Sequence, residues 1–180
     1  MSQELITYIV LGSLERLKNL KKPVLESSEE YLFANFENQK QIVPTIDNLV
    51  ANANGRVVVF LPPSCIPDKK SKDALKKISM IDISTWGWFE IKNKENDILK
   101  SLKKLRTKIR SIPSIEQGIY FNKRLYFSVG GIGKFGSKPF KEISKRFYTR
   151  IDPQNPLPSL IIRSKNLNLF QFYESLPSNC

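Results

Sequence analysis

Two carboxylates and a lysine stand close together in the middle of the chain, in a pattern that suits metal-dependent chemistry. Asp82 lies eight positions before Glu90, and Lys92 follows Glu90 with one residue between them. Residues 81–92 are expected to form a hairpin, because apolar and polar residues alternate on both sides of Gly87. Alternate side chains of a strand share a face, so the three side chains are predicted to project together. Two carboxylates can hold Mg²⁺ while a lysine assists a water molecule, which cleaves a phosphodiester without histidine.

The order of these residues resembles that of the PD-(D/E)xK nuclease superfamily. In that family a strand bearing Asp precedes a strand bearing Glu-x-Lys, and a helix and a further strand follow. Here a predicted helix at 95–111 and a strand near 125–129 follow the triplet, and the resemblance spans about residues 45–130. It implies a nuclease whose two carboxylates bind Mg²⁺ and whose three polar residues are catalytic. A second register is also open, with Glu26 and the segment 37–39 as a degenerate version.

The chain contains no histidine and only two cysteines, Cys65 and Cys180, among its 180 residues. Without histidine, one chain cannot activate a serine or cysteine nucleophile through an imidazole, and two cysteines alone cannot complete a zinc site. No cofactor is expected except Mg²⁺ under the nuclease hypothesis. The low cysteine count favours a reducing, cytoplasmic compartment, with Cys65 as a small buried apolar residue. No stretch reaches the roughly 20 apolar residues that a membrane span requires.

Residues 95–111 are predicted to form an amphipathic helix with one apolar and one cationic face. Ile98, Leu102 and Leu105 are spaced by four and three residues, as one face of a helix requires. The other face carries only basic charges after Asp97, and such a face can lie along phosphates and release their counterions. The residues of this helix predicted to bind nucleic acid are Lys100, Lys103, Lys104, Arg106, Lys108 and Arg110.

A glycine-rich segment at 130–136 is the second basic element. It is expected to follow a strand and to lead into a helix from Ser137 to about Tyr148, which would expose backbone N–H groups to an anion. The segment lacks the spacing of a Walker A loop and of the dinucleotide fingerprint. Aromatic residues between its lysines can stack on exposed bases. The residues predicted to bind nucleic acid here are Lys134, Lys138, Lys141, Lys145 and Arg146.

The charge of the chain is concentrated in its second half. Residues 1–92 hold 12 basic and 11 acidic residues, whereas residues 93–180 hold 17 basic and 6 acidic ones. The net charge at pH 7 is therefore +1 in the first half and +11 in the second. Such asymmetry predicts a surface that faces a polyanion.

The remaining periodicities predict an α/β (or α+β) fold with a mixed central sheet flanked by helices. A helix is expected at 3–20, where apolar residues recur at helical spacing. Residues 1–150 are expected to form the core domain, and residues 151–180 a proline-rich loop with C-terminal strands packed on it. The other predicted elements are strands at 31–37 and 56–61, helices at 45–53 and 69–79 (the latter capped by Asp68), a hairpin joining 119–121 to 125–129, and one or two strands that include 161–162 and 167–172.

Three functions remain open on this reasoning. The leading hypothesis is a basic protein that binds nucleic acid, or another polyanion, through its cationic helix and glycine-rich segment. The second is the Mg²⁺-dependent nuclease. The third is a basic structural or assembly protein that binds an acidic protein partner, for which Trp86 and Trp88 would supply an anchor if they are exposed.

Overall fold

The central sheet is organised around strand β3 (Val57–Leu61). A computed structural model describes residues 6–18, 20, 23–24, 26–36, 38–81, 83–91, 112–164, 167 and 169, and within them the strand order is β2-β1-β3-β6-β5. All five residues of β3 are buried, as expected for a run of β-forming side chains in the middle of a sheet. The predicted α/β architecture, a mixed sheet with helices on its faces, is confirmed.

The N-terminal element is a strand, so the helix predicted at 3–20 is wrong. Strand β1 (Ile6–Ser13) and the short helix α1 (Leu14–Lys18) take its place. β1 lies between β2 (Glu29–Phe36) and β3 and runs parallel to both. All eight residues of β1 are buried, because the strand is covered on both faces and therefore lacks the alternation of a half-exposed strand. In such a continuous apolar run, residues at helical spacing do not indicate a helix.

The two strands and two helices predicted between residues 31 and 79 are confirmed. β2 is followed by the 3₁₀ helix η1 (Gln39–Gln41) and by α2 (Ile42–Asn52), which leads to β3. Helix α3 (Lys69–Met80) follows β3. Asp68 caps α3 as predicted, because its side-chain oxygen accepts a hydrogen bond from the Ser71 N–H at 2.8 Å.

The hairpin predicted at 81–92 does not form in the residues described there. β5 (Trp86–Gly87) pairs antiparallel with β6 (Ile119–Asn122), and the segment 154–157 runs along its other edge through backbone hydrogen bonds. Ile81 is the C-cap of α3, and the described residues 83–85 of the expected first arm form no strand. All four residues at 86–89 are buried, so the polar face that the prediction required is absent from this strand.

The second predicted hairpin is also wrong, because a helix replaces its second arm. β6 leads directly into α5 (Lys123–Ser128). Asn122 begins this helix, since its side-chain oxygen accepts a hydrogen bond from the Arg124 N–H at 2.9 Å. Asparagine is common both at helix N-caps and in turns, so the local sequence permits either a helix or a hairpin after Asn122.

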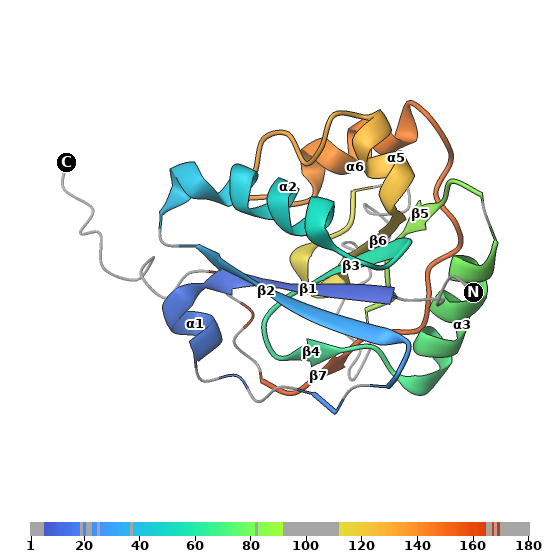
Figure 1. Ribbon diagram of the computed structural model, residues 1–180, viewed down its shortest axis with the longest axis horizontal. Helices are drawn as coiled ribbons and strands as arrows, with labels where there is room; N and C mark the ends of the chain where they lie inside the picture. Colours follow the sequence, from blue (N-terminus) through green and yellow to red (C-terminus); the bar gives the residue numbers. More distant parts are fainter. Residues whose placement is uncertain are drawn as a thin grey trace, which may run out of the picture.

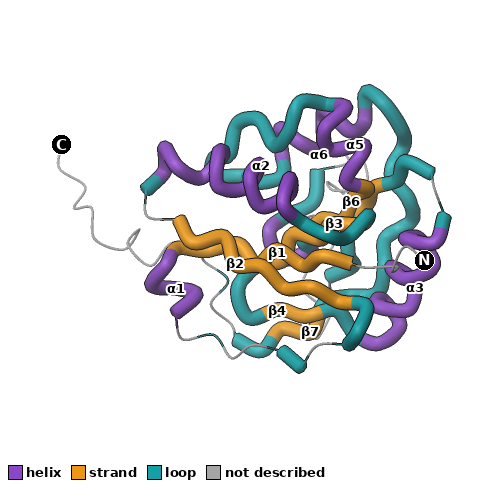
Figure 2. Tube along the Cα trace, in the orientation of Figure 1, coloured by secondary structure: helices purple, strands orange, loops and turns teal. Residues whose placement is uncertain are grey.

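Helices cover both faces of the sheet (Figure 1). α2, α5 and α6 (Lys141–Tyr148) lie on one face, whereas α1, α3 and the pair β4 (Cys65–Ile66) and β7 (Ile161–Ile162) lie on the other (Figure 2). β3 contributes to the core on each side, because its alternate side chains point to opposite faces. None of the helices in the described part of the chain is long and apolar enough to span a membrane.

Candidate nucleic-acid interface

Helices α5 and α6 lie side by side over β6, because both pack on Phe121. The ring centroid of Tyr126 in α5 lies 5.1 Å from that of Phe121, and the ring centroid of Phe147 in α6 lies 5.3 Å from it. On each helix the next residue is an exposed ring: Phe127 is 48% exposed and Tyr148 is 55% exposed. Phe127 was not predicted to be an exposed ring, because residues 125–129 were expected to form a strand.

The glycine-rich segment is folded around a carboxylate of the protein itself. Asp47 of α2 accepts a hydrogen bond from the Ile132 N–H at 3.1 Å and another from the Tyr126 hydroxyl. Gly131 has a φ of +77°, and a Cβ there would lie 2.7 Å from Asp47 Oδ1, so this approach requires glycine. Burial and the bond to Asp47 raise the pKa of Tyr126, which keeps its hydroxyl protonated as a donor. The Ile132 N–H, which was expected to face a bound anion, therefore contacts the Asp47 carboxylate of α2 instead.

The flanks of the segment also differ from the prediction. The segment follows α5 rather than a strand, and α6 begins at Lys141, later than expected. Arg146 of α6 holds the segment: its Nη1 lies 3.4 Å from the carbonyl oxygens of both Val129 and Gly130. Its Nε lies 3.3 Å from the Glu142 carboxylate. Arg146, predicted to bind nucleic acid, thus has a positioning role within the protein.

Replacing Asp47 with alanine is expected to release the glycine-rich segment and to lower the free energy of unfolding by about 2 kcal/mol. The substitution leaves the Tyr126 hydroxyl and the Ile132 N–H without their acceptor. Hydrogen exchange at the Ile132 amide measures the release, and urea unfolding measures the stability. Asp152→Ala, at an exposed loop position, is the matched control. Equal exchange rates at Ile132 in the two variants would contradict the role assigned to Asp47.

Lysines dominate the exposed part of this region. None of the four predicted lysines forms an ion pair or hydrogen bond through its ammonium group with any residue in the described ranges. Residues 123–150, which we call the basic surface, hold eight basic residues and a single acidic one, Glu142. Arg150 is also exposed and was not among the predicted binding residues. The four exposed, unpaired lysines are Lys134, Lys138, Lys141 and Lys145.

Of the predicted triplet, which consists of two carboxylates and a lysine, the structure describes Glu90 alone. Asp82 and Lys92 lie outside the described residues. Glu90 is exposed, and its backbone N–H donates to the Leu157 carbonyl at 2.8 Å. Within the described ranges, no group of three or more His, Cys, Asp or Glu side chains is arranged to hold a metal ion. β5 pairs with β6 rather than with a second arm of a hairpin, so the described residues form no hairpin that would bring the three predicted side chains to one face.

The other predicted features have mixed outcomes. The cationic helix at 95–111, with all six of its basic residues, lies outside the described residues. In the alternative carboxylate register Glu37 lies outside them too, and Glu26 is paired with lysines of α3, which lowers the pKa of its carboxyl. Trp86 and Trp88 are 0% and 5% exposed, so they are core residues rather than an anchor for a partner.

Comparison with known proteins adds no functional assignment. No protein-family model matches this chain, and no curated protein matches it. The resemblance of the triplet Asp82, Glu90 and Lys92 to the PD-(D/E)xK nucleases therefore stays a prediction.

Proposed function

We propose that this protein binds nucleic acid through the basic surface formed by α5, the glycine-rich segment and α6. The observation that carries the proposal is the charge imbalance of residues 123–150, where four exposed lysines form no ion pair with a described residue. A phosphate backbone supplies negative charges at regular intervals, and each phosphate that a lysine neutralises releases bound counterions. The same four lysines therefore favour a polyanion as their partner.

Two exposed rings favour nucleic acid over other polyanions. Phe127 of α5 and Tyr148 of α6 are exposed, one on each helix of the basic surface. Bases of a single strand stack on exposed aromatic side chains, with a contribution of about 1–3 kcal/mol per base. An acidic protein segment offers comparable charge but no succession of flat rings. A single-stranded oligonucleotide is therefore the suitable probe.

Neutralising two lysines of α6, as Lys141→Gln/Lys145→Gln, is expected to weaken oligonucleotide binding about tenfold at low salt. Loss of two phosphate contacts should also reduce the slope of log affinity against log salt by about 1.4, since each single-strand contact contributes about 0.7. Fluorescence anisotropy of a labelled oligonucleotide over a salt series measures both quantities. The matched control, Lys69→Gln/Lys70→Gln, removes two exposed lysines from α3 on the opposite face of the sheet (Figure 1).

The control variant distinguishes a defined surface from general basicity. Equal losses of affinity in the two double variants would show that no particular face attracts the oligonucleotide. Affinity that does not change with salt would contradict phosphate contacts altogether. Competition with polyglutamate at equal charge tests the acidic-protein alternative. If polyglutamate displaces the oligonucleotide as well as unlabelled nucleic acid does, the partner is an acidic protein instead.

A further inference from the structure

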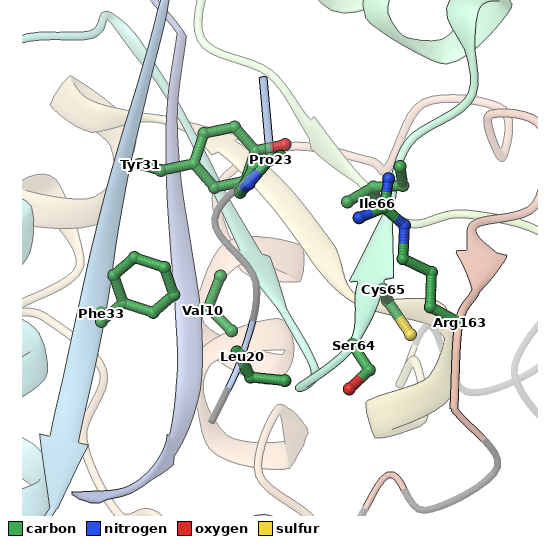
Figure 3. Close-up of a pocket in the computed structure, with 9 residues that line it drawn as sticks. All are labelled: Val10, Leu20, Pro23, Tyr31, Phe33, Ser64, Cys65, Ile66 and Arg163. Carbon is green, nitrogen blue, oxygen red and sulfur yellow. The ribbon is translucent and has the colours of Figure 1, made fainter. Parts of the chain in front are cut away.

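A small pocket lies between the sheet and the β4–β7 pair (Figure 3). This pair is on the face of the sheet opposite α5 and α6 (Figure 1). Its volume is about 190 Å³. Val10 and Phe33, from the neighbouring strands β1 and β2, form one wall, and Ile66 of β4 stands across from them. Leu20 and Pro23, from the chain between α1 and β2, also line it. Most of the lining is therefore apolar.

Two polar groups stand at one end of this pocket. The Tyr31 hydroxyl is buried and has no hydrogen-bond partner in the described structure. The Arg163 guanidinium forms no ion pair with any carboxylate among the described residues. Burial and the charge of Glu29 raise the pKa of Tyr31, and the charge of Arg163 opposes that rise, as expected for neighbouring groups. Figure 3 shows both groups at the same end of the pocket, on side chains from opposite walls. A buried hydroxyl without a partner calls for a ligand atom that accepts its hydrogen bond.

The backbone beside the pocket is strained at Ser64, which holds the backbone of the exposed residue Arg163. Ser64 has a φ of +60°, the single positive φ outside glycine in the described part of the chain. A side chain in this left-handed region crowds its own carbonyl group, so the conformation is unfavourable for serine. It places the Ser64 carbonyl where it accepts a hydrogen bond from the Arg163 backbone N–H at 2.8 Å. Strain of this kind is concentrated at binding and active sites.

We propose that this pocket binds a small apolar carboxylate, whose charged end contacts Arg163 and the Tyr31 hydroxyl. The apolar body of the ligand lies between Phe33 and Ile66. A cavity of about 150 Å³ with an apolar lining accommodates a benzene ring. A volume of about 190 Å³ therefore has room for a ring that carries one carboxylate. The planar guanidinium matches a carboxylate through two parallel hydrogen bonds, and the tyrosine hydroxyl adds a third.

The remaining lining favours an anion over a cation or a metal. Burial raises the pKa of Cys65 to about 12, so its thiol stays neutral near pH 7 and serves as part of the apolar wall. No Asp or Glu is among the described residues that line the pocket. Arg163 is the charged group among them, so a ligand in the pocket meets a cation in the lining rather than a carboxylate.

Titration of isotopically labelled protein with benzoate, and separately with benzamide, tests this proposal through NMR chemical shifts. We expect benzoate to shift the amide signals of Tyr31, Phe33 and Ser64. Arg163→Gln is expected to weaken benzoate binding about tenfold, because it removes the charge and the paired donors of the guanidinium. Tyr31→Phe is expected to weaken it about threefold, because it removes the hydroxyl donor. Benzamide has the same shape without the charge. Its affinity should be lower than that of benzoate in the wild type and should change less than about twofold in Arg163→Gln.

Arg150→Gln, an exposed arginine on the opposite face, controls for the loss of one positive charge and should leave benzoate affinity unchanged. Urea unfolding shows whether each variant is folded, and the benzoate–benzamide comparison in the wild type is independent of any variant. Equal affinity for the two compounds, or benzoate shifts confined to other residues or absent at its solubility limit, overturns the proposal. Oligonucleotide binding by Arg163→Gln should match the wild type, so this proposal and the proposed function fail independently.

Discussion

Replacing Gly118 with alanine is expected to lower the free energy of unfolding by about 4 kcal/mol. Gly118 joins the 3₁₀ helix η2 (Ile115–Gln117) to β6 with a φ of 59° and a ψ of −178°, a region that only glycine occupies readily. A Cβ there would lie 2.8 Å from the Phe60 carbonyl oxygen. That oxygen belongs to the backbone of the central strand β3, so it cannot move aside as a flexible side chain would. Backbone strain and overpacking each contribute about 1–3 kcal/mol.

Gly136→Ala is the matched control, because a Cβ at that exposed position would meet no atom within 4 Å. Its free energy of unfolding is expected to change by less than about 0.5 kcal/mol. Urea unfolding followed by tryptophan fluorescence measures both variants, since Trp86 and Trp88 are buried in and beside β5. A loss below about 1 kcal/mol in Gly118→Ala would mean that the connection into β6 differs from the one described.

Replacing Lys72 with methionine is expected to destabilise the fold by about 3 kcal/mol. Lys72 of α3 lies 2.8 and 2.9 Å from the two carboxylate oxygens of Glu29, whose side chain is 0% exposed. The same carboxylate accepts hydrogen bonds from the Tyr8 hydroxyl at 3.4 Å and from the Glu26 N–H at 3.3 Å. Methionine fills similar space but leaves the carboxylate buried without its counter-charge. Removing one partner of a buried ion pair costs about 3–5 kcal/mol, and the 16% exposure of Lys72 favours the lower value.

The double variant Glu29→Gln/Lys72→Met separates the charge effect from the packing effect. Glutamine keeps a side-chain acceptor for Tyr8 and Glu26 and needs no counter-charge, so most of the lost stability should return. Urea unfolding of the wild type, the two single variants and the double variant forms a complete thermodynamic cycle. If the double variant is no more stable than Lys72→Met, the destabilisation comes from lost packing of the lysine stem instead.

Sequence reasoning succeeded where an element has one buried and one exposed face. In α3, Leu75 is buried while Lys69, Lys70 and Lys77 are exposed. Asp68, a residue type favoured at N-caps, indicates where the helix begins. A pattern of this kind records which residues meet water, so it can be recognised without knowing the partner element. The same reasoning failed at β1, because a strand that is buried on both faces shows no alternation.

The candidate interface was predicted in part, for a related reason. Its lysines are visible in the composition, since basic residues accumulate where acidic ones are missing. The role of Asp47 was not predicted, because its contacts with Tyr126 and Ile132 join positions 79 and 85 residues apart. Arg146 likewise looks like one more surface cation in the sequence, and only its contacts with the carbonyl groups of the glycine-rich segment reveal its positioning role.

By itself, the sequence determined the limits of the chemistry: a chain without histidine, an α/β alternation of elements, and a positive second half. The tertiary structure alone decided which charged side chains stay unpaired and which, like those of Arg146 and Asp47, bond to other parts of the protein. It also decided where a pocket forms, since Val10, Tyr31, Ile66 and Arg163 come from four separate segments. The physical reason is that periodicity reports each residue's exposure to water locally, whereas contacts between distant segments depend on which strands pair and which helices cover them.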